Sequence, residues 1–234
     1  MNIGKFCAAL AACAIWLPGL AGAATINVDN FSFENPSVTG FTFGTDVTGW
    51  TKFGGTGLAG VVNWPGAAPG SPFATAIPDG SQAAYSNGPS LSQNLSDVGQ
   101  AGSYALSVWV GNRPSNSIPD HEIRLFAGST LLATSGGSGT YNGVAPDDGI
   151  ESWTKLVATG TLAAGDAGLG DSLRIELINK GTGGFAGGEQ IGWDLVELDF
   201  IAATPPTVVP LPAAGWLLLW SLAGLVAFKR RSRT

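Results

Sequence analysis

The single histidine, His121, is the residue in this sequence best suited to moving protons near neutral pH. Asp120 precedes it directly, and a carboxylate that orients an imidazole is part of a nucleophilic relay. Neighbouring residues of a β-strand point to opposite faces, however, so the pair is poorly placed for such a relay. The two cysteines, Cys7 and Cys13, both lie close to the N-terminus, and the rest of the chain therefore has no thiol nucleophile. We expect His121 to be a solvated residue at the start of a strand.

A second group with chemical potential is the acidic cluster Asp147, Asp148 and Glu151, in a segment flanked by glycine and proline. A glycosidase needs two carboxyl groups about 5–10 Å apart, which such a loop could supply. Acidic loops are more often solvated or act as weak cation sites. The sequence has no nucleophile elbow, phosphate loop or transition-metal motif. It therefore predicts no catalytic residue and a protein that is not an enzyme.

The elements that must position these residues are short strands. The chain contains 35 glycines and 14 prolines, and residues 25–204 show no sustained helical periodicity. Runs typical of strands recur instead, from 26–33 near the start to 191–201 at the end, with turn residues between them. This cadence predicts an all-β fold, an antiparallel β-sandwich of the jelly-roll kind, over residues 25–203.

The alternation of residue types within the strands predicts which faces form the core. Leu173, Ile175 and Leu177 share one face of their strand, and Asp194 shares the aliphatic face of the last strand. Trp109 and Trp193 fall on the faces opposite the aliphatic ones, where exposed rings could stack on sugars. Arg113 follows a strand end, a place where ligand loops gather. We expect these three residues to bind ligand. The alternative for the two tryptophan rings is that glycine-rich loops cover them.

Charge is distributed unevenly along the chain. Residues 25–204 carry seventeen acidic and six basic side chains, a formal charge of −11. A domain this acidic repels phosphate backbones, so nucleic acid is excluded as a partner. Divalent cations and neutral glycans remain compatible with this charge.

The N-terminus has the three parts of a secretory signal peptide over residues 1–24. Lys5 supplies a positive charge, residues 6–20 are uncharged and apolar, and Ala21-Gly22-Ala23 is a small-residue cleavage site. Leu10-Ala11-Ala12-Cys13 also fits a lipoprotein box, in which Cys13 would be lipidated. The apolar run continues past that box to Leu20, which favours ordinary cleavage.

The C-terminus, residues 204–234, has the pattern of a membrane anchor. Residues 207–228 carry no charge and would span about 33 Å as a helix, enough for a bilayer core of about 30 Å. A basic cluster follows directly and predicts a cytoplasmic end that stops transfer, formed by Lys229, Arg230, Arg231 and Arg233.

This tail resembles a known sorting signal. The motif Val209, Pro210, Leu211, Pro212, Ala213, then the apolar stretch and the basic cluster, is similar to the VPLPA variant of the PEP-CTERM tails of Gram-negative bacteria. The resemblance implies recognition by an exosortase-type enzyme and processing near the motif. It also implies association with exopolysaccharide and the cell surface. We expect export across the inner membrane, anchoring by the C-terminus, and a periplasmic, outer-surface or extracellular location after processing.

The two ends of the sandwich resemble galactose-binding-like and carbohydrate-binding jelly rolls. Asn30-Phe31-Ser32-Phe33-Glu34-Asn35-Pro36 is similar to their opening strand, and residues 192–198 to their closing strand. In that family the matching Glu and Asp bind a structural calcium ion, which implies a site at Glu34 and Asp194. A buried carboxylate at position 194 would need such a partner, and a hard cation with oxygen ligands would satisfy it. The alternative is a turn-capping Asp194 and a solvated Glu34.

These observations together predict a surface-sorted, non-catalytic β-sandwich associated with extracellular polysaccharide. A structural or adhesive surface protein without a glycan site is the first alternative. A secreted glycoside hydrolase is the second.

Overall fold

The computed structural model describes residues 22–39, 44, 46–63, 76–112, 118–137, 153–181 and 189–203. These residues belong to one compact unit, Ala21–Ala203. Their regular structure is entirely β, which confirms the predicted fold class. The part of the chain covered by these ranges contains no helix able to cross a membrane, and the expected span at 207–228 lies outside it.

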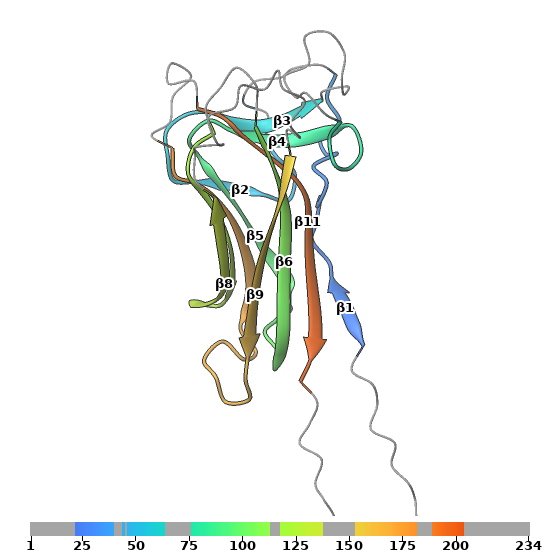
Figure 1. The fold of residues 1–234 in the computed structure, drawn as a ribbon, viewed down its shortest axis with the longest axis vertical. Helices are drawn as coiled ribbons and strands as arrows, with labels where there is room; N and C mark the ends of the chain where they lie inside the picture. Colours follow the sequence, from blue (N-terminus) through green and yellow to red (C-terminus); the bar gives the residue numbers. More distant parts are fainter. Residues whose placement is uncertain are drawn as a thin grey trace, which may run out of the picture. The chain divides into compact units, whose positions relative to one another are not determined.

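The described residues form eleven strands in two antiparallel sheets (Figure 1). Sheet A has the order β3-β4-β11-β6-β9, and β1 pairs with β11. Its strands are β1 (Ala23–Ile26), β3 (Ala59–Asn63), β4 (Gln82–Ser86), β6 (Gly102–Asn112), β9 (Trp153–Leu162) and β11 (Ile191–Ala202). Sheet B has the order β2-β5-β10-β7-β8. Its strands are β2 (Thr51–Phe53), β5 (Ser90–Val98), β7 (His121–Ala127), β8 (Thr130–Gly137) and β10 (Ser172–Asn179).

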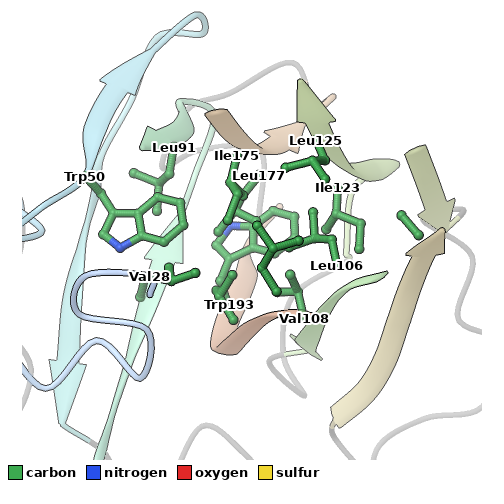
Figure 2. Packing of buried hydrophobic residues seen from close by; sticks show 14 of the residues in the cluster. Val28, Trp50, Leu91, Leu106, Val108, Ile123, Leu125, Ile175, Leu177 and Trp193 are labelled. Carbon is green, nitrogen blue, oxygen red and sulfur yellow. The ribbon is translucent and has the colours of Figure 1, made fainter. Parts of the chain in front are cut away.

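The main core fills the space between the sheets, as Figure 2 shows. In β10, buried residues alternate with partly exposed ones, so that Leu173, Ile175 and Leu177 are fully buried, as predicted. β7 repeats this alternation with Ile123, Leu125 and Ala127. A period of two buries one face of each strand. Each fully buried Leu or Ile contributes about 1.5–3 kcal/mol to folding.

The last strand departs from the predicted alternation. The register of β11 against β6 shifts between Asp194 and Glu197, and Leu195 has a φ of 45°. Such a β-bulge adds one residue and exchanges the faces of the residues before it. Val196 and Leu198 therefore face the main core, but so does Trp193, which is fully buried among Leu106, Val108 and Leu177 (Figure 2). The prediction that Trp193 faces away from the core is wrong.

The first predicted strand, 26–33, is also mostly wrong. β1 ends at Ile26, and the following residues turn, with Asn30 and Phe33 both at positive φ. The Asn30 side chain holds this turn through hydrogen bonds to the backbone of Asn35 and Thr48. Asn tolerates the left-handed region and bonds readily to nearby backbone, which explains the turn. The turn brings Glu34 close to the start of β4.

Candidate acidic and aromatic site on sheet A

A second hydrophobic cluster lies on the face of sheet A that points away from sheet B. Its buried members are Val62, Ile77, Ala83, Tyr85 and Trp153, with Leu58 and Trp109 packed against them. All five residues of β4 are buried, so this strand is covered on both faces. Two-sided burial is unusual for an antiparallel strand in a sandwich, where one face normally meets solvent. This end of sheet A therefore supports a second layer of side chains, which we call the outer cluster.

A continuous row of paired residues crosses sheet A beneath the outer cluster. Tyr85 is opposite Gly60 and Gly192, Gly192 is opposite Gly111, and Gly111 is opposite Trp153. Residues opposite each other in a sheet project from the same face. Two glycines thus separate the Tyr85 side chain from that of Trp153. The Tyr85 hydroxyl accepts a hydrogen bond from the Gly44 amide, 2.8 Å away.

Asp194 joins the outer cluster through the bulge in β11. It is opposite Trp109 on β6, so the two side chains leave the same face of sheet A. Asp194 is fully buried. The prediction that its carboxyl shares a face with Val196 is wrong, because the bulge separates them. Asp194 and Trp109 therefore lie on the same face of sheet A, and Trp193 lies on the opposite face.

The Asp194 carboxyl is held by one oxygen only. Its Oδ2 accepts a hydrogen bond from the Asp79 amide at 2.8 Å, whereas Oδ1 is buried without a hydrogen-bond partner. Burial raises the pKa of Asp194 to about 8, against the lowering effect of the Asp79 and Leu195 amides. The nearby charges of Asp79 and Glu34 raise the pKa further. The group is therefore largely protonated at neutral pH, with Oδ1 the natural position for the proton.

Glu34 clamps the turn that leads into β4. Its Oε1 accepts hydrogen bonds from the amides of Ser81 and Gln82 at 2.7 and 2.8 Å, and its Oε2 accepts one from the Ser81 hydroxyl. Gly80, at a φ of 64°, leaves room for the carboxylate, because a Cβ there would lie 2.2 Å from Glu34 Oε1. Glu34 is thus engaged by this turn, which also supplies the Asp79 amide to Asp194. Glu34 is also partly exposed, so both the calcium ligand and the solvated alternative stay predictions.

The described residues contain no group of three or more His, Cys, Asp or Glu side chains able to share a metal ion. The free Asp194 oxygen is nevertheless what a cation ligand would offer, and Glu34 lies close enough to affect its pKa. The pair is therefore compatible with a hard cation whose other ligands are backbone carbonyls.

His121 lies apart from the outer cluster. It starts β7 on the core face of sheet B and is buried, so the expectation of a solvated residue is wrong. Its Nδ1 lies 2.8 Å from the Pro119 carbonyl oxygen, and its ring meets Trp193 edge-on at 6.2 Å between centroids. Burial lowers the pKa of His121, partly offset by the Pro119 carbonyl and the Asp120 charge.

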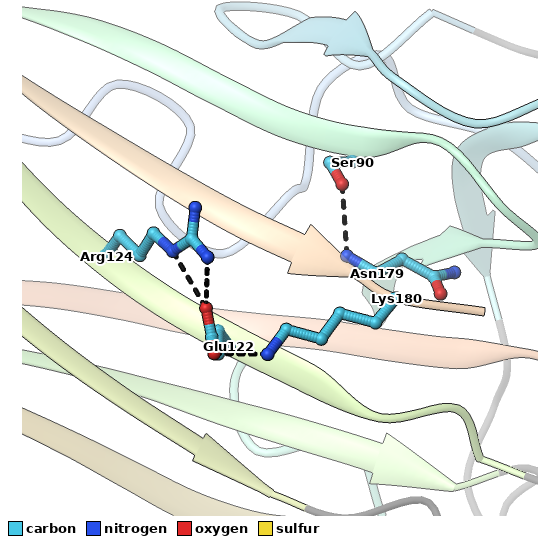
Figure 3. A network of polar contacts seen from close by, with 5 residues as sticks. All are labelled: Ser90, Glu122, Arg124, Asn179 and Lys180. Carbon is cyan, nitrogen blue, oxygen red and sulfur yellow. Dashed lines mark hydrogen bonds and ion pairs between the residues drawn. The ribbon is translucent and has the colours of Figure 1, made fainter.

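A network of polar contacts lies at one end of sheet B (Figure 3). Glu122 forms ion pairs with Arg124 and Lys180. The backbone amide of Asn179 donates a hydrogen bond to the Ser90 hydroxyl at 3.1 Å. The Lys180 and Arg124 charges lower the pKa of Glu122, although burial acts in the opposite direction. This network ties the ends of β7, β10 and β5 together and presents paired charges to solvent.

The remaining predicted site residues lie outside the described residues. They are Arg113, Asp147, Asp148, Glu151, the motif Val209–Ala213 and the basic residues from Lys229 to Arg233. Among the predicted ligand residues, Trp109 is partly buried in the outer cluster, which matches the alternative of a second small core. Sequence reasoning did not bring Tyr85 and Trp153 together in one cluster. A signal in the sequence is the glycine at positions 60, 111 and 192. It indicates the cluster only when the strand register is known, because the register places these glycines in one row with Tyr85.

Comparison with known proteins decides the family. A family model described as HpiC1 cyclase matches residues 24–199, three quarters of the chain. The chain belongs to the HpiC1-like family. No curated protein shows significant sequence similarity to this HpiC1-like chain.

Solved structures agree with the HpiC1-like fold. A Stig cyclase from Fischerella sp. TAU, in complex with (3Z)-3-(1-methyl-2-pyrrolidinylidene)-3H-indole, is 24% identical, with 78% of this chain and 100% of that chain covered and a TM-score of 0.64. A Fischerella sp. TAU cyclase in complex with 4-(1H-indol-3-yl)butan-2-one is also 24% identical, covering 77% of this chain and 100% of that one, with a TM-score of 0.62. The tandem CBM22 domains of Paenibacillus barcinonensis Xyn10C are also similar, at 16% identity, 85% and 49% coverage and a TM-score of 0.43.

The HpiC1-like assignment corrects two expectations. The sequence patterns predicted a non-catalytic protein associated with extracellular polysaccharide, and a family defined by a cyclase overturns that prediction. The same finding replaces the expected absence of enzymatic activity with membership of an enzyme family. The expected sorting signal gains no support from the comparisons. The two antiparallel sheets of the described residues form the β-sandwich that the sequence predicted.

Proposed function

We propose that this chain is a cyclase that closes a ring within a single unsaturated substrate at the outer cluster of sheet A. The observation that carries the proposal is a buried carboxyl, Asp194, that shares a sheet face with aromatic side chains and keeps one oxygen free. Membership of a cyclase family supports the reaction class. Indole compounds bound in two Fischerella cyclases make indole derivatives the first substrates to test.

In the proposed reaction, Asp194 donates the proton on Oδ1 to the substrate. Protonation leaves an electron-deficient carbon, which a π-bond of the same molecule attacks to form the new ring bond. Loss of a proton from the cyclised cation, back to the carboxylate, restores both the enzyme and charge balance. A carboxyl with a raised pKa suits this role, because it holds its proton at neutral pH and can release it in the transition state.

The aromatic members of the outer cluster suit the charge that forms during such a reaction. The outer cluster contains the rings of Trp109, Trp153 and Tyr85, and the face of such a ring attracts a cation by about 0.5–2 kcal/mol. An apolar wall also keeps water away from the cation, so the reaction ends in ring closure and not in hydration.

The alternative occupant of the free Asp194 oxygen is calcium. The buried, partnerless Oδ1 and the neighbouring negative charge of Glu34 fit a cation bound between the two carboxylates. A calcium ion there would join the turn before β4 to β11 and stabilise the fold. Asp194 would then be ionised and could not serve as the proton donor.

Asp194→Asn tests the proposed function. The purified chain is incubated with indole derivatives that carry an unsaturated side chain, and isomeric products are followed by chromatography with mass detection. We expect Asp194→Asn to lower the rate about 10²–10⁴-fold, because the amide cannot donate an acidic proton. Asp199→Asn, at an exposed position of the same strand, is the matched control and should retain the rate. An Asp194→Asn variant as active as the control would exclude the proton-donor role.

Assays and melting curves in excess chelator and in millimolar calcium separate the two roles of Asp194. If Asp194 is the acid, chelator leaves activity unchanged. If calcium is the occupant, chelator lowers the melting temperature of the wild type and has no effect on Asp194→Asn.

We further propose that the cyclase is exported across the inner membrane of a Gram-negative bacterium. The signal-peptide pattern of residues 1–24 and the uncharged apolar stretch 207–228 before a basic cluster support this location. The VPLPA-like motif at Val209–Ala213 supports recognition by a membrane-bound sorting enzyme. Mass spectrometry of both native termini tests the proposal, which predicts a new N-terminus near Ala23 or Ala24.

A further inference from the structure

A short segment, residues 118–121, leads into β7 and packs against the main core. Ile118 belongs to that core, and His121, the first residue of β7, is only 5% exposed. The Asp120 carbonyl accepts a hydrogen bond from the Lys180 amide at 2.8 Å, which fastens the segment to the end of β10. We call residues 118–121 the latch, because buried side chains and this backbone hydrogen bond hold the segment against the core.

The His121 ring is enclosed by three neighbours. Its Nδ1 donates a hydrogen bond to the Pro119 carbonyl, with 2.8 Å between the two atoms, because a carbonyl oxygen can only accept. Another edge of the ring rests on β8, where a Cβ on Gly137 would lie 2.4 Å from Nε2 and 2.7 Å from Cε1. The Trp193 ring on β11 meets it edge-on at 6.2 Å between centroids. Nε2 has no hydrogen-bond partner among the described residues, which suits the neutral ring, whose Nε2 carries no proton.

The strands packed against the ring place no charge beside it within the described residues. β8 and β10 pair with His121 through Gly137 and Asn179, and β11 contributes Trp193. Asp194 follows Trp193 but projects from the opposite face of sheet A. The ionisable side chains that surround the latch are those of Asp120, Glu122, Lys180 and Glu189.

These surroundings give the effect of pH a definite sign. Burial is the largest influence and lowers the pKa of His121 from its usual 6.5; the charge of Lys180 acts in the same direction, whereas the Pro119 carbonyl and the charge of Asp120 raise the pKa. A group whose pKa is lowered by folding stabilises the folded state above its unfolded value, and this stability is lost as the pH falls below about 6.5. Asp194 has the opposite sign, because its raised pKa favours the folded state in acid. Loosening of the fold between pH 6.5 and pH 5 therefore points to the histidine.

We propose that the latch is an acid-sensitive switch, in which protonation of His121 at Nε2 drives the ring into water and releases the latch from β8 and β10. The core offers the charged ring neither water nor an acceptor for its new N–H group. Ile118 leaves with the ring, because it lies three residues away on the same short segment. Trp193 then loses a ring neighbour directly before Asp194, so the change reaches the margin of the outer cluster. The inference stands apart from the proposed reaction, because it concerns the fold and needs no substrate.

Hydrogen–deuterium exchange of the full chain, expressed without a histidine tag, tests the switch. Protection of the amides of residues 118–127 is compared between pH 7 and pH 5, after correction for the intrinsic pH dependence of exchange. We expect this protection to fall by about 3- to 10-fold between pH 6.5 and pH 5.5, because one proton changes an opening equilibrium by at most about tenfold per pH unit. Residues 102–110 of β6, in the other sheet, should keep their protection and serve as the internal reference.

Three variants identify His121 as the sensor. His121→Asn keeps a donor for the Pro119 carbonyl but cannot become charged, so its protection should not change over this pH range. Asp120→Asn removes a carboxylate that favours the charged ring and should move the midpoint to lower pH. Asp199→Asn, which removes an exposed carboxylate from β11, is the matched control and should leave the midpoint in place. Gly137→Ala puts a methyl group where the Nε2 edge rests and should open the latch already at pH 7.

The titration can also be followed directly, because the chain has a single histidine and its ring signals in a proton NMR spectrum need no assignment. We expect the ring to titrate below pH 6.5, over the range in which protection is lost. The same acid loss of protection in His121→Asn as in the wild type would overturn the inference, and so would a wild type whose protection is unchanged down to pH 5. If His121→Asn does not fold, Asp120→Asn decides, and an unchanged midpoint rejects the switch. None of these measurements uses turnover, so a chain without cyclase activity still confirms or rejects it.

Discussion

At the scale of single residues, the carboxyl of Asp194 has the most unusual environment among the described acidic residues. Asp194 is buried, has one oxygen without a partner and stands near two other acids, all of which favour its neutral form. His121, the residue that the sequence offers most readily for proton transfer, is instead packed in the main core against Trp193. The environment, and not the residue type, thus decides which group can donate a proton.

The raised pKa of Asp194 makes stability depend on pH in a definite direction. The pKa rises from 3.8 in the unfolded chain to about 8 in the folded one, so the folded state binds the proton more tightly. The stability from this proton is complete below about pH 4 and is lost as the pH rises through 8, on the order of 5 kcal/mol in all. We expect urea titrations to show Asp194→Asn gaining on the wild type between pH 5 and pH 9. A parallel pH profile for the two proteins in chelator would contradict the raised pKa.

At the scale of elements, the bulge in β11 decides which side chains reach which layer. Strict alternation places Trp193 outside and Asp194 with the aliphatic core, and the one-residue shift after Asp194 reverses both. A bulge of this kind depends on pairing with β6 and leaves no periodic signal in the sequence of β11 itself. The alternation of β10 has no such interruption, and the sequence predicts its core residues correctly. The fold class and the regular strands were therefore predictable, whereas the outer cluster required the register of five strands.

The two tryptophans separated by the bulge should differ in their effect on stability. Trp193 is fully buried in the main core, whereas Trp109 is partly buried at the margin of the outer cluster. We expect Trp193→Ala to lower the free energy of unfolding by about 3–5 kcal/mol, because truncating a buried aromatic leaves a cavity. Trp109→Ala should cost less than half as much. Chemical denaturation at pH 6 measures both, and equal losses would mean that the bulge is misplaced.

A glycine at the junction of the two sheets provides a second element-scale prediction. Gly160 on β9 passes so close to β8 that a Cβ would lie 2.0 Å from the carbonyl oxygen of Leu132. The obstacle is backbone, which cannot rotate away as a side chain can. We expect Gly160→Ala to destabilise the fold by about 1–3 kcal/mol, as overpacking does. Thr161→Ala, a substitution at the next position, which is exposed, is the control for a change of side-chain size on this strand.

At the scale of the whole molecule, the sandwich supports two apolar layers with very few positive charges. Six basic residues against seventeen acidic ones leave residues 25–204 at −11. Asp46, Glu122, Glu176 and Glu197 have ion-pair partners within the described residues, with Glu122 shared between two cations. Because acidic residues outnumber basic ones almost three to one, ion pairs within the domain cannot neutralise most of the negative charge, and self-repulsion of this kind opposes the compact state.

Salt should therefore stabilise the described domain. Raising sodium chloride from 20 mM to 500 mM shortens the screening length from about 20 Å to about 4 Å, below the spacing of most surface charges. We expect the melting temperature of residues 22–203 to rise by a few degrees, with sodium and potassium chloride equally effective because only screening is involved. A rise produced by micromolar calcium and not by either monovalent salt would instead indicate a specific cation at Asp194 and Glu34. If the proposed cyclase activity is the same at both salt concentrations, the negative charge of the domain is not needed for it, as expected for a reaction that we propose to depend on the buried carboxyl of Asp194.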